Sequence, residues 1–275
     1  MSLAQSMCRN VPRRSIVRST QGWPLDVTYS RNVNDGVFFF GEYEPGLSAI
    51  IKDLVEPGDT CFDIGANFGW YTMLFSHLCG KNGAVHSFEP VPGALRQLRA
   101  NVELLGDDPN VTVNGLALGD QEGEITINTF EDLGLGYSSI SDLGRDDAKP
   151  VTCRMTTLDQ YFQENEIKNF SFLKADIEGA ELMLFKGAEA VFRERPPLMM
   201  IEISASLTAC FDYSPNDLLD QISNMADYRF YTADEVSGSM MHFERFSPDD
   251  AGGYVFCLPV KGFENRVKRL SSRIR

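Results

Sequence analysis

From residue 60 onward, short runs of β-branched and aromatic residues alternate with stretches in which apolar residues recur every three or four positions. Continuous apolar runs are typical of strands buried on both faces of a parallel sheet, and the longer spacing is typical of helices that cover such a sheet. The pattern therefore predicts an α/β fold with a doubly wound, mostly parallel sheet. Seven strands are predicted, at residues 60–64, 84–88, 111–118, 170–175, 198–203, 228–232 and, running antiparallel, 253–260.

The remaining segments are assigned around this core. Residues 124–155 contain two predicted strands, 124–130 and 151–155, on either side of a polar, glycine-rich stretch that is too short for a core of its own. We interpret them as an insertion over the sheet that can form a flap beside a site. The predicted boundaries are an N-terminal extension at 1–41, a main domain at 42–260 and a basic tail at 261–275. Helices are predicted at residues 47–55, 70–78, 92–105, 158–165, 180–193 and 215–226, and a hairpin at 29–40.

Composition narrows the class of protein. With 275 residues, 43% hydrophobic and 23% charged, the chain is neither disordered nor fibrous. No apolar run approaches the roughly 20 residues that cross a bilayer, and the first 20 residues lack the apolar core of a signal peptide. Six cysteines without a CxxC pair disfavour a zinc site or a disulfide framework. We therefore expect a cytoplasmic protein with reduced thiols.

The net charge of −14 is unevenly distributed. Residues 1–31 carry about +4 and residues 261–275 about +5, which leaves about −23 on residues 32–260. A body this acidic repels phosphate backbones, so DNA and RNA are disfavoured as substrates. The basic ends could contact a membrane or a partner, but solvated faces or frayed termini are the more common cause of such charge runs.

The strongest local feature is the segment Asp63-Ile64-Gly65-Ala66-Asn67-Phe68-Gly69, after the first predicted strand of the sheet. Ligands of open α/β sheets bind at the carboxyl ends of strands, where glycines let backbone N–H groups approach them. The spacing is GxxxG rather than the GxGxxG of dinucleotide sites. Asp63 would repel a pyrophosphate but suits an ammonium or sulfonium group, which indicates S-adenosylmethionine. The alternative is an ordinary strand–turn–helix that needs glycine for its geometry.

Two further groups of acids follow predicted strands. Glu89 ends the second strand, where an acidic residue can hold ribose hydroxyls, although it could also be a solvated strand end. Asp176, Glu178 and Glu181 follow the strand at 170–175. They could orient a hydroxyl, accept its proton or hold a divalent cation. For Glu181, the favourable effect of an acid in the first turn of a helix is an equally good explanation.

Other candidate residues are weaker. His77 and His86 fall in a predicted helix and strand, and His242 in a predicted loop before the last strand, far from the carboxyl edge of the sheet. The chain has neither a GxSxG motif nor a P-loop.

Several of these motifs, taken together and in order, resemble the FkbM-type S-adenosylmethionine-dependent methyltransferases. The resemblance covers roughly residues 42–203. It implies a seven-stranded class I methyltransferase sheet and methylation of a hydroxyl on a sugar, glycan or polyketide-type molecule, with S-adenosylhomocysteine as product. The motifs are Tyr43-Glu44, the segment 63–72, Phe88-Glu89-Pro90, Ala117-Leu118-Gly119, the segment 176–181 and Ile201-Glu202.

The resemblance also implies roles for individual residues. Gly65, Asn67 and Gly69 would surround the methionine end of the cofactor, beside Asp63. Glu89 would hold the ribose, and Leu118 would lie near the adenine. Asp176 would lie nearest the methyl group, and the remaining predicted pocket residues are Glu44, Glu178, Glu181 and Glu202.

These roles predict a reaction in which a hydroxyl attacks the sulfonium methyl in line and Asp176 accepts the proton. No metal is predicted, although an oxygen-ligated divalent cation at Asp176, Glu178 or Glu181 is an alternative way to activate the hydroxyl. A nicotinamide-dependent oxidoreductase and a cofactor-binding module without turnover remain alternative functions. Methylation of protein or nucleic-acid nitrogen is disfavoured, because the Asn-Pro-Pro-aromatic run of such enzymes is absent. The acceptor and the oligomeric state are left open.

Overall fold

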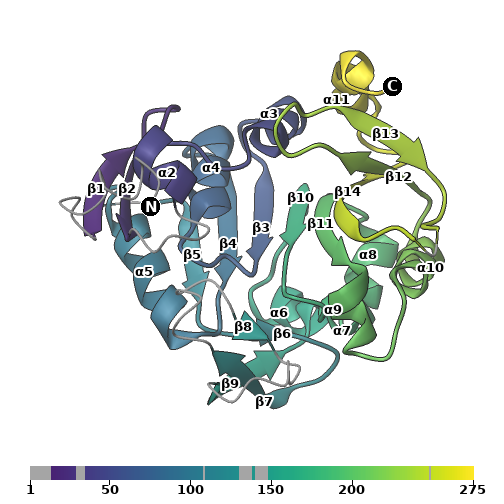
Figure 1. Ribbon diagram of the computed structural model, residues 1–275, viewed down its shortest axis with the longest axis horizontal. Coiled ribbons are helices and arrows are strands. Elements are labelled where there is room, and N and C mark those ends of the chain that lie inside the picture. Colours follow the sequence, from purple (N-terminus) through teal and green to yellow (C-terminus); the bar gives the residue numbers. More distant parts are fainter. Residues whose placement is uncertain (1–13, 29–34, 108, 130–137, 140–147, 248) are drawn as a thin grey trace, which may run out of the picture.

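The computed structural model describes residues 14–28, 35–107, 109–129, 138–139, 148–247 and 249–275. An eight-stranded sheet forms its centre, with the strand order β13-β12-β14-β11-β10-β3-β4-β5 (Figure 1). The five strands from β11 to β5 pair in parallel, and β14 lies antiparallel between β11 and β12. The bounds are β3 Thr60–Ile64, β4 Ala84–Phe88, β5 Val111–Asn114, β10 Phe172–Ala175, β11 Leu198–Ser204, β12 Tyr228–Ala233, β13 Met240–Phe243 and β14 Gly252–Pro259.

The predicted doubly wound α/β fold, with an antiparallel last strand, is confirmed. The predicted number of seven strands is too low, because β13 pairs with β12 and extends the sheet. His242 therefore lies on a strand and not in a loop, with its ring 5.3 Å from that of Tyr231. Only four residues long and beginning with two methionines, β13 has little of the β-branched character that identifies a strand in a sequence.

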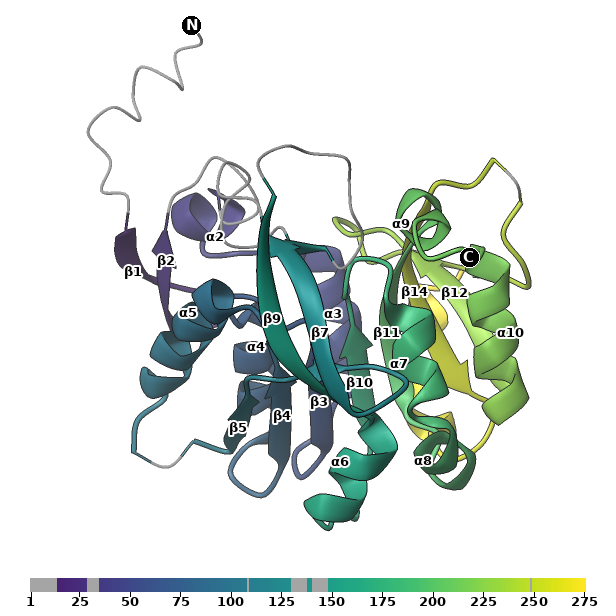
Figure 2. The same cartoon turned by 90° about the horizontal axis from the view of Figure 1, so that it is seen from below.

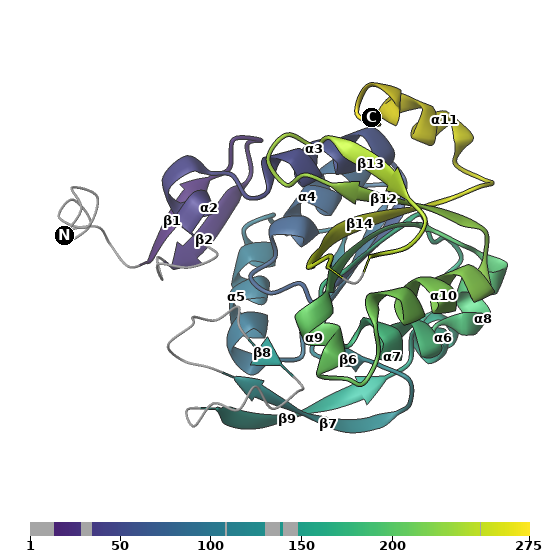
Figure 3. The same cartoon turned by 45° about the vertical axis from the view of Figure 1, so that its right-hand side comes forward.

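Helices cover both faces of the sheet, as Figure 3 shows, with α3 and α4 on one side and α6, α7, α8 and α10 on the other. Successive residues of a strand point to opposite faces, so Cys61 belongs to one apolar cluster and its neighbour Phe62 to the other. This double burial explains the continuous apolar runs in the sequence. The helices are α3 Pro45–Leu54, α4 Trp70–Cys79, α5 Pro92–Glu103, α6 Leu158–Glu164, α7 Glu181–Lys186, α8 Glu189–Glu194, α9 Ala205–Ala209 and α10 Pro215–Met225.

The helix predicted at 180–193 is two helices, α7 and α8, separated at Gly187. A Cβ on Gly187 would overlap the carbonyl oxygen of Gly119, so the chain turns where two backbones meet. The helical periodicity of the sequence cannot reveal this contact, because Gly119 is distant from Gly187 in the sequence.

The insertion, together with β6, forms a second sheet with the order β6-β9-β7-β8, and its strands β7 and β9 lie in front of the main sheet in Figure 2. The strand predicted at 111–118 is wrong in its second half: β5 ends at Asn114, and β6 belongs to this second sheet. Ile127 and Cys153 pack against Val91 and Ala94 at the start of α5. Much of the predicted flap lies outside the described residues. The strands are β6 Ala117–Leu118, β7 Gly123–Thr129, β8 Ser138–Ser139 and β9 Lys149–Thr156.

The predicted hairpin at 29–40 is wrong. Residues 29–34 lie outside the described residues, and α2 (Asp35–Phe40) is a helix. The hairpin lies earlier and consists of β1 (Arg14–Arg18) and β2 (Pro24–Thr28). It packs on α5 through Asn101, whose side chain accepts from Asp26 N at 2.6 Å and donates to Phe68 O at 2.7 Å.

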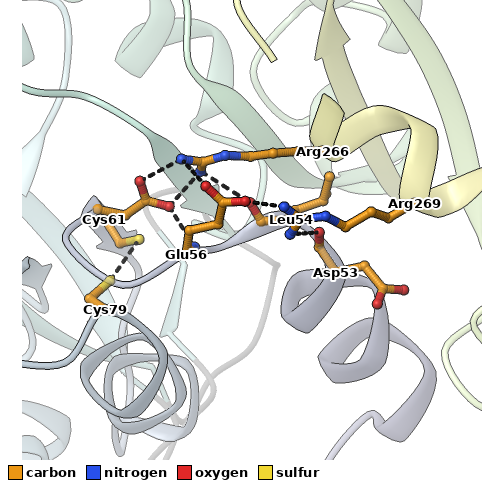
Figure 4. A network of polar contacts seen from close by, with 8 residues as sticks. Asp53, Leu54, Glu56, Cys61, Cys79, Arg266 and Arg269 are labelled. Atoms are coloured by element: carbon orange, nitrogen blue, oxygen red, sulfur yellow. Dashed lines mark hydrogen bonds and ion pairs between the residues drawn. The ribbon is translucent and has the colours of Figure 1, made fainter. Parts of the chain in front are cut away.

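The basic C-terminal segment is folded and not a frayed tail. It forms α11 (Glu264–Val267) and a 3-10 turn (Lys268–Ser272), and Leu270 is fully buried. Figure 4 shows arginines of this segment against the acidic end of α3 and the loop after it. The ion pairs are Arg266 with Asp59 and Glu56, Arg269 with Glu56, and Arg273 with Asp53. Local charge could not reveal these partners, which lie about 200 residues earlier.

Replacing Arg266 by Ala is expected to lower the free energy of unfolding by about 2–4 kcal/mol, because the buried carboxylate of Asp59 loses its positively charged partner. The Arg266 guanidinium donates to both Asp59 oxygens, at 2.5 and 2.9 Å, and only 7% of the Asp59 side chain is exposed. Urea unfolding measures the change. The control is Arg193→Ala, which breaks an exposed pair with Glu189 and should cost about 0.5 kcal/mol or less. Equal losses in both variants would contradict the prediction.

Candidate functional site

One cavity of about 260 Å³ lies at the carboxyl ends of β3, β4, β10 and β11. This is the edge at which open α/β sheets bind ligands. Five of the seven residues predicted for the cofactor line it, as do three of the four further pocket residues. These lining residues are Gly65, Asn67, Glu89, Leu118 and Asp176, with Glu44, Glu178 and Glu202.

The backbone N–H groups of the glycine turn after β3 have hydrogen-bond partners within the protein. The N–H groups of Gly65 and Ala66 both donate to Phe88 O at 3.0 Å, and Asn67 N donates to Glu89, so these groups are engaged within the protein. A Cβ on Gly65 would overlap the carbonyl oxygen of Asp176. Gly65, with φ of 74°, therefore allows the turns after β3 and β10 to touch.

Two predicted cofactor residues lie outside the lining of the cavity. Gly69 begins α4 with φ of 96°, and a Cβ there would come within 2.7 Å of Leu98. Asp63 is fully buried, and its Oδ2 accepts from Thr72 Oγ1 at 2.6 Å. Within the described part of the chain its Oδ1 has no hydrogen-bond partner. Burial is the main cause of a raised pKa for Asp63.

Glu89 is a buried carboxylate held by two backbone donors. Its Oε2 accepts from Asn67 N and its Oε1 from Val91 N, both at 2.9 Å. Burial raises the pKa of Glu89 to about 7, against the opposing effect of these two hydrogen bonds. The side chain thus projects in a fixed orientation from the end of β4 into the cavity.

Asp176 begins the turn after β10 and stands among other acids. Repulsion by Asp176, together with burial, raises the pKa of Glu202 far enough to keep that carboxyl protonated at neutral pH. Burial, followed by repulsion from Asp176, raises the pKa of Glu178 to about 8. Glu178 also has φ of 57°, a left-handed conformation unusual for its type.

Lys174 lines the cavity, but the sequence analysis assigned it no role. It is buried on β10, and its Nζ lies 3.4 Å from Asp176 Oδ2 and 3.7 Å from Asp63 Oδ1. It donates to Gly65 O at 2.8 Å. The feature of the sequence that could have identified Lys174 as a site residue is its place inside the otherwise apolar strand Phe172–Ala175.

Glu44 lines the cavity and contacts two tyrosines. Its carboxylate accepts from Tyr71 OH and, at 2.9 Å, from Tyr254 OH. Burial is the main cause of a raised pKa for Glu44. Tyr254 comes from β14, 210 residues away, and no local pattern marked it as a pocket residue.

Glu181 does not line the cavity, in contrast to the prediction. Its Oε1 accepts from Ile177 N at 3.0 Å and Gly179 N at 3.4 Å, and its Oε2 lies 3.3 Å from Tyr213 OH. Burial raises the pKa of Glu181 to about 7. The side chain therefore holds the turn after β10 and the start of α7, the structural alternative considered for it.

The three histidines also lie outside the lining. His86 Nδ1 is 2.8 Å from Tyr161 OH, and burial lowers the pKa of His86 to about 4. The rings of His77 and Trp23 are 5.4 Å apart. Among the residues that the structure describes, no three His, Cys, Asp or Glu side chains converge to hold a metal ion. No helix in the described ranges has the length and apolar character needed to cross a membrane.

Comparison with known proteins places this chain among methyltransferases. Residues 63–230 match the family described as the methyltransferase FkbM domain. The chain is 51% identical over 47 residues to the 31-O-demethyl-FK506 methyltransferase FkbM of Streptomyces tacrolimicus. This match covers 17% of this chain and 18% of that protein. It is 25% identical over 146 residues to the hexuronic acid methyltransferase AglP of Haloferax volcanii, and this match covers 52% of this chain and 56% of the relative. The matches therefore cover less than two thirds of either relative.

Methyltransferase FkbM from Methylobacillus flagellatus KT superposes with a TM-score of 0.47 and 20% identity. The match covers 72% of this chain and 43% of that one.

Proposed function

Because the chain belongs to the FkbM methyltransferase family, we propose that it methylates a hydroxyl oxygen of a sugar, glycan or polyketide-type small molecule. The predicted family and enzyme class are confirmed by the match over residues 63–230, and the cofactor of the proposed reaction is S-adenosylmethionine. The observation that carries the proposal is that Glu89 and Asp176, from two different strand ends, line one cavity.

The residues of the cavity fit this cofactor. Each Glu89 oxygen accepts one backbone N–H and has a second lone pair, so the carboxylate can also accept from two ribose hydroxyls. Leu118 and Ile127 provide an apolar wall that suits an adenine. The acidic groups around Asp176 favour a positive charge nearby. When bound, S-adenosylmethionine supplies a methyl group attached to a cationic sulfur. The sulfur becomes neutral when it leaves, so it needs little assistance as a leaving group.

The protein's own contribution is then to orient the acceptor, exclude water and receive a proton. Asp176 is the proposed base: as the acceptor oxygen bonds to the methyl carbon and the carbon–sulfur bond breaks, the hydroxyl proton passes to its carboxylate. Glu44, Glu178 and Glu202 line the same cavity and can bind further hydroxyls of the acceptor.

The charged residues that line the cavity favour an acceptor whose reacting group is uncharged. Among the described lining residues the one ammonium is that of Lys174, and its contacts go to Gly65, Asp63 and Asp176. An acceptor hydroxyl is therefore easier to accommodate here than a carboxylate or a phosphate. The two relatives are named for a 31-O-demethyl compound and for a hexuronic acid, which supports a small acceptor with oxygen functions.

Calorimetric titration with S-adenosylhomocysteine, and with NAD in parallel, tests the cofactor. We expect micromolar binding of S-adenosylhomocysteine alone. Glu89→Ala should weaken it by about 100-fold or more, because two hydrogen bonds to a charged group contribute about 1.5–3 kcal/mol each. The control is Glu103→Ala, which removes an exposed carboxylate of α5.

Other outcomes separate the alternatives. Binding of NAD alone would replace the proposal with an oxidoreductase. Tight binding of S-adenosylhomocysteine without turnover of any sugar or polyketide hydroxyl would favour a binding module.

A further inference from the structure

Lys174 joins the glycine turn to the proposed base. Its ammonium donates to Gly65 O at 2.8 Å and lies 3.4 Å from Asp176 Oδ2, and only 3% of the residue is exposed. Asp63 Oδ1, at 3.7 Å, is the third oxygen around it. One cation is thus shared by the turn after β3, the strand β3 itself and the turn after β10.

The surroundings of Asp176 are otherwise acidic or neutral. Burial disfavours the charge of Lys174, but the negative charges of Asp176, Asp63 and Glu44 outweigh it and raise the pKa of the ammonium. The ammonium is therefore charged and already engaged at neutral pH. The titratable groups that face Asp176 from the surrounding elements are Lys174 on β10, Asp63 on β3, Tyr43 and Glu44 before α3, Tyr71 on α4, Glu178 and Glu181 around the turn, Glu202 on β11 and Tyr254 on β14.

A buried lysine here is not explained by stability. Its neighbours on β10 are Phe172, Leu173 and Ala175, all fully buried, and an apolar side chain would suit such a strand. Burying charges costs desolvation energy that their mutual attraction often only balances. The position of the charge, between the glycine turn and Asp176, therefore calls for a functional explanation.

We propose that Lys174 is a positioning residue that keeps the Asp176 carboxylate ionised and holds it against the turn of Gly65. This inference rests on the proposed function, in which Asp176 receives the proton of the acceptor. Without the cation, the Asp176 carboxylate loses its positively charged neighbour and its link to the turn of Gly65, and burial then favours its neutral form. Lys174 itself keeps its proton and acts through Asp176.

Binding of two cofactor analogues tests this without an acceptor. S-adenosylhomocysteine has a neutral sulfur, whereas sinefungin carries an ammonium group near the position of the transferred methyl. The ratio of their affinities, measured by calorimetry from pH 5 to 9 in the wild type and in Asp176→Asn, isolates the charge of Asp176, because Glu89, Glu178 and Glu202 are present in both proteins. We expect the preference for sinefungin to fall at acidic pH in the wild type. The part of this transition that belongs to Asp176 should be absent in Asp176→Asn.

Three variants separate charge from geometry. Lys174→Gln keeps a donor for Gly65 O but loses the charge, and its transition should move to higher pH by about one unit or more. Lys174→Arg keeps the charge, so its transition should stay near that of the wild type. Lys174→Met removes both charge and donor and should shift like Lys174→Gln, which provides a second measurement if Gln impairs folding. Thermal unfolding checks each variant.

A transition at the wild-type pH in both uncharged variants would overturn the proposal. Equal loss of affinity for both analogues at every pH would also overturn it, since Lys174 would then only support the glycine turn. If the wild type binds neither analogue, the proposed function itself fails. That result is distinct from an unshifted transition in a protein that binds both.

Discussion

Asp176→Asn is expected to lower kcat by about 10²- to 10⁴-fold, the usual contribution of a general base. Asn keeps the size of the side chain and can still accept from Lys174, whose Nζ lies 3.4 Å from Asp176 Oδ2, but it cannot take the acceptor's proton. Affinity for S-adenosylhomocysteine should change by less than about threefold, because the sulfur of this product carries no charge for Asp176 to attract. The expected signature is lost turnover with the cofactor pocket intact.

The measurement is initial-rate kinetics with a hydroxyl acceptor obtained from a sugar and polyketide screen, beside calorimetry of the same preparation. Asp120→Asn is the matched control, since Asp120 is exposed and lies outside the lining. Full turnover by Asp176→Asn would remove Asp176 from the role of base.

Gly65→Ala is expected to destabilise the protein by about 3–5 kcal/mol and to weaken S-adenosylhomocysteine binding by at least about 100-fold. The backbone of Gly65 has φ of 74°, and a Cβ would overlap the carbonyl group of Asp176. Backbone atoms cannot move aside as a flexible side chain can. The turns after β3 and β10 would have to separate, which displaces Gly65, Lys174 and Asp176 together.

Gly58→Ala distinguishes this overlap from simple backbone strain. Gly58 has φ of 91°, but a Cβ there meets nothing within 4 Å. This variant should lose about 1 kcal/mol, the cost of a left-handed conformation for an alanine, and should bind S-adenosylhomocysteine normally. Urea unfolding of both variants provides the comparison. Equal losses would mean that the contact between the two turns is unimportant for stability.

The sequence was most informative where local chemistry and tertiary environment agree. Strands β3 and β4 were predicted with their observed bounds, since each is a short segment, buried on both faces, that ends just before a turn. The second half of the strand predicted at 111–118 was wrong, because Ala117–Leu118 pairs with β9 in another sheet. Strand propensity shows that a segment is extended, but not which partner it has.

The candidate site shows the same division. Acids at the carboxyl ends of strands of one parallel sheet had to meet at the same edge, so Glu89 and Asp176 could be paired from the sequence. Glu181 follows the same strand as Asp176, yet its carboxylate faces the backbone of Ile177 and Gly179. The direction of a side chain within a turn depends on backbone dihedrals that residue types alone do not fix.

By itself, the sequence determined the α/β class, the edge of the sheet that carries the site and the family, because periodicity and strand-end chemistry are local properties. Only the tertiary structure decided that Lys174 stands between the glycine turn and Asp176, that Tyr254 reaches Glu44 and that Arg266 holds Asp59. Each of these is a contact of a charged or polar group with a partner from a distant segment. Its energy depends on burial and distance, which arise only when the segments have packed together.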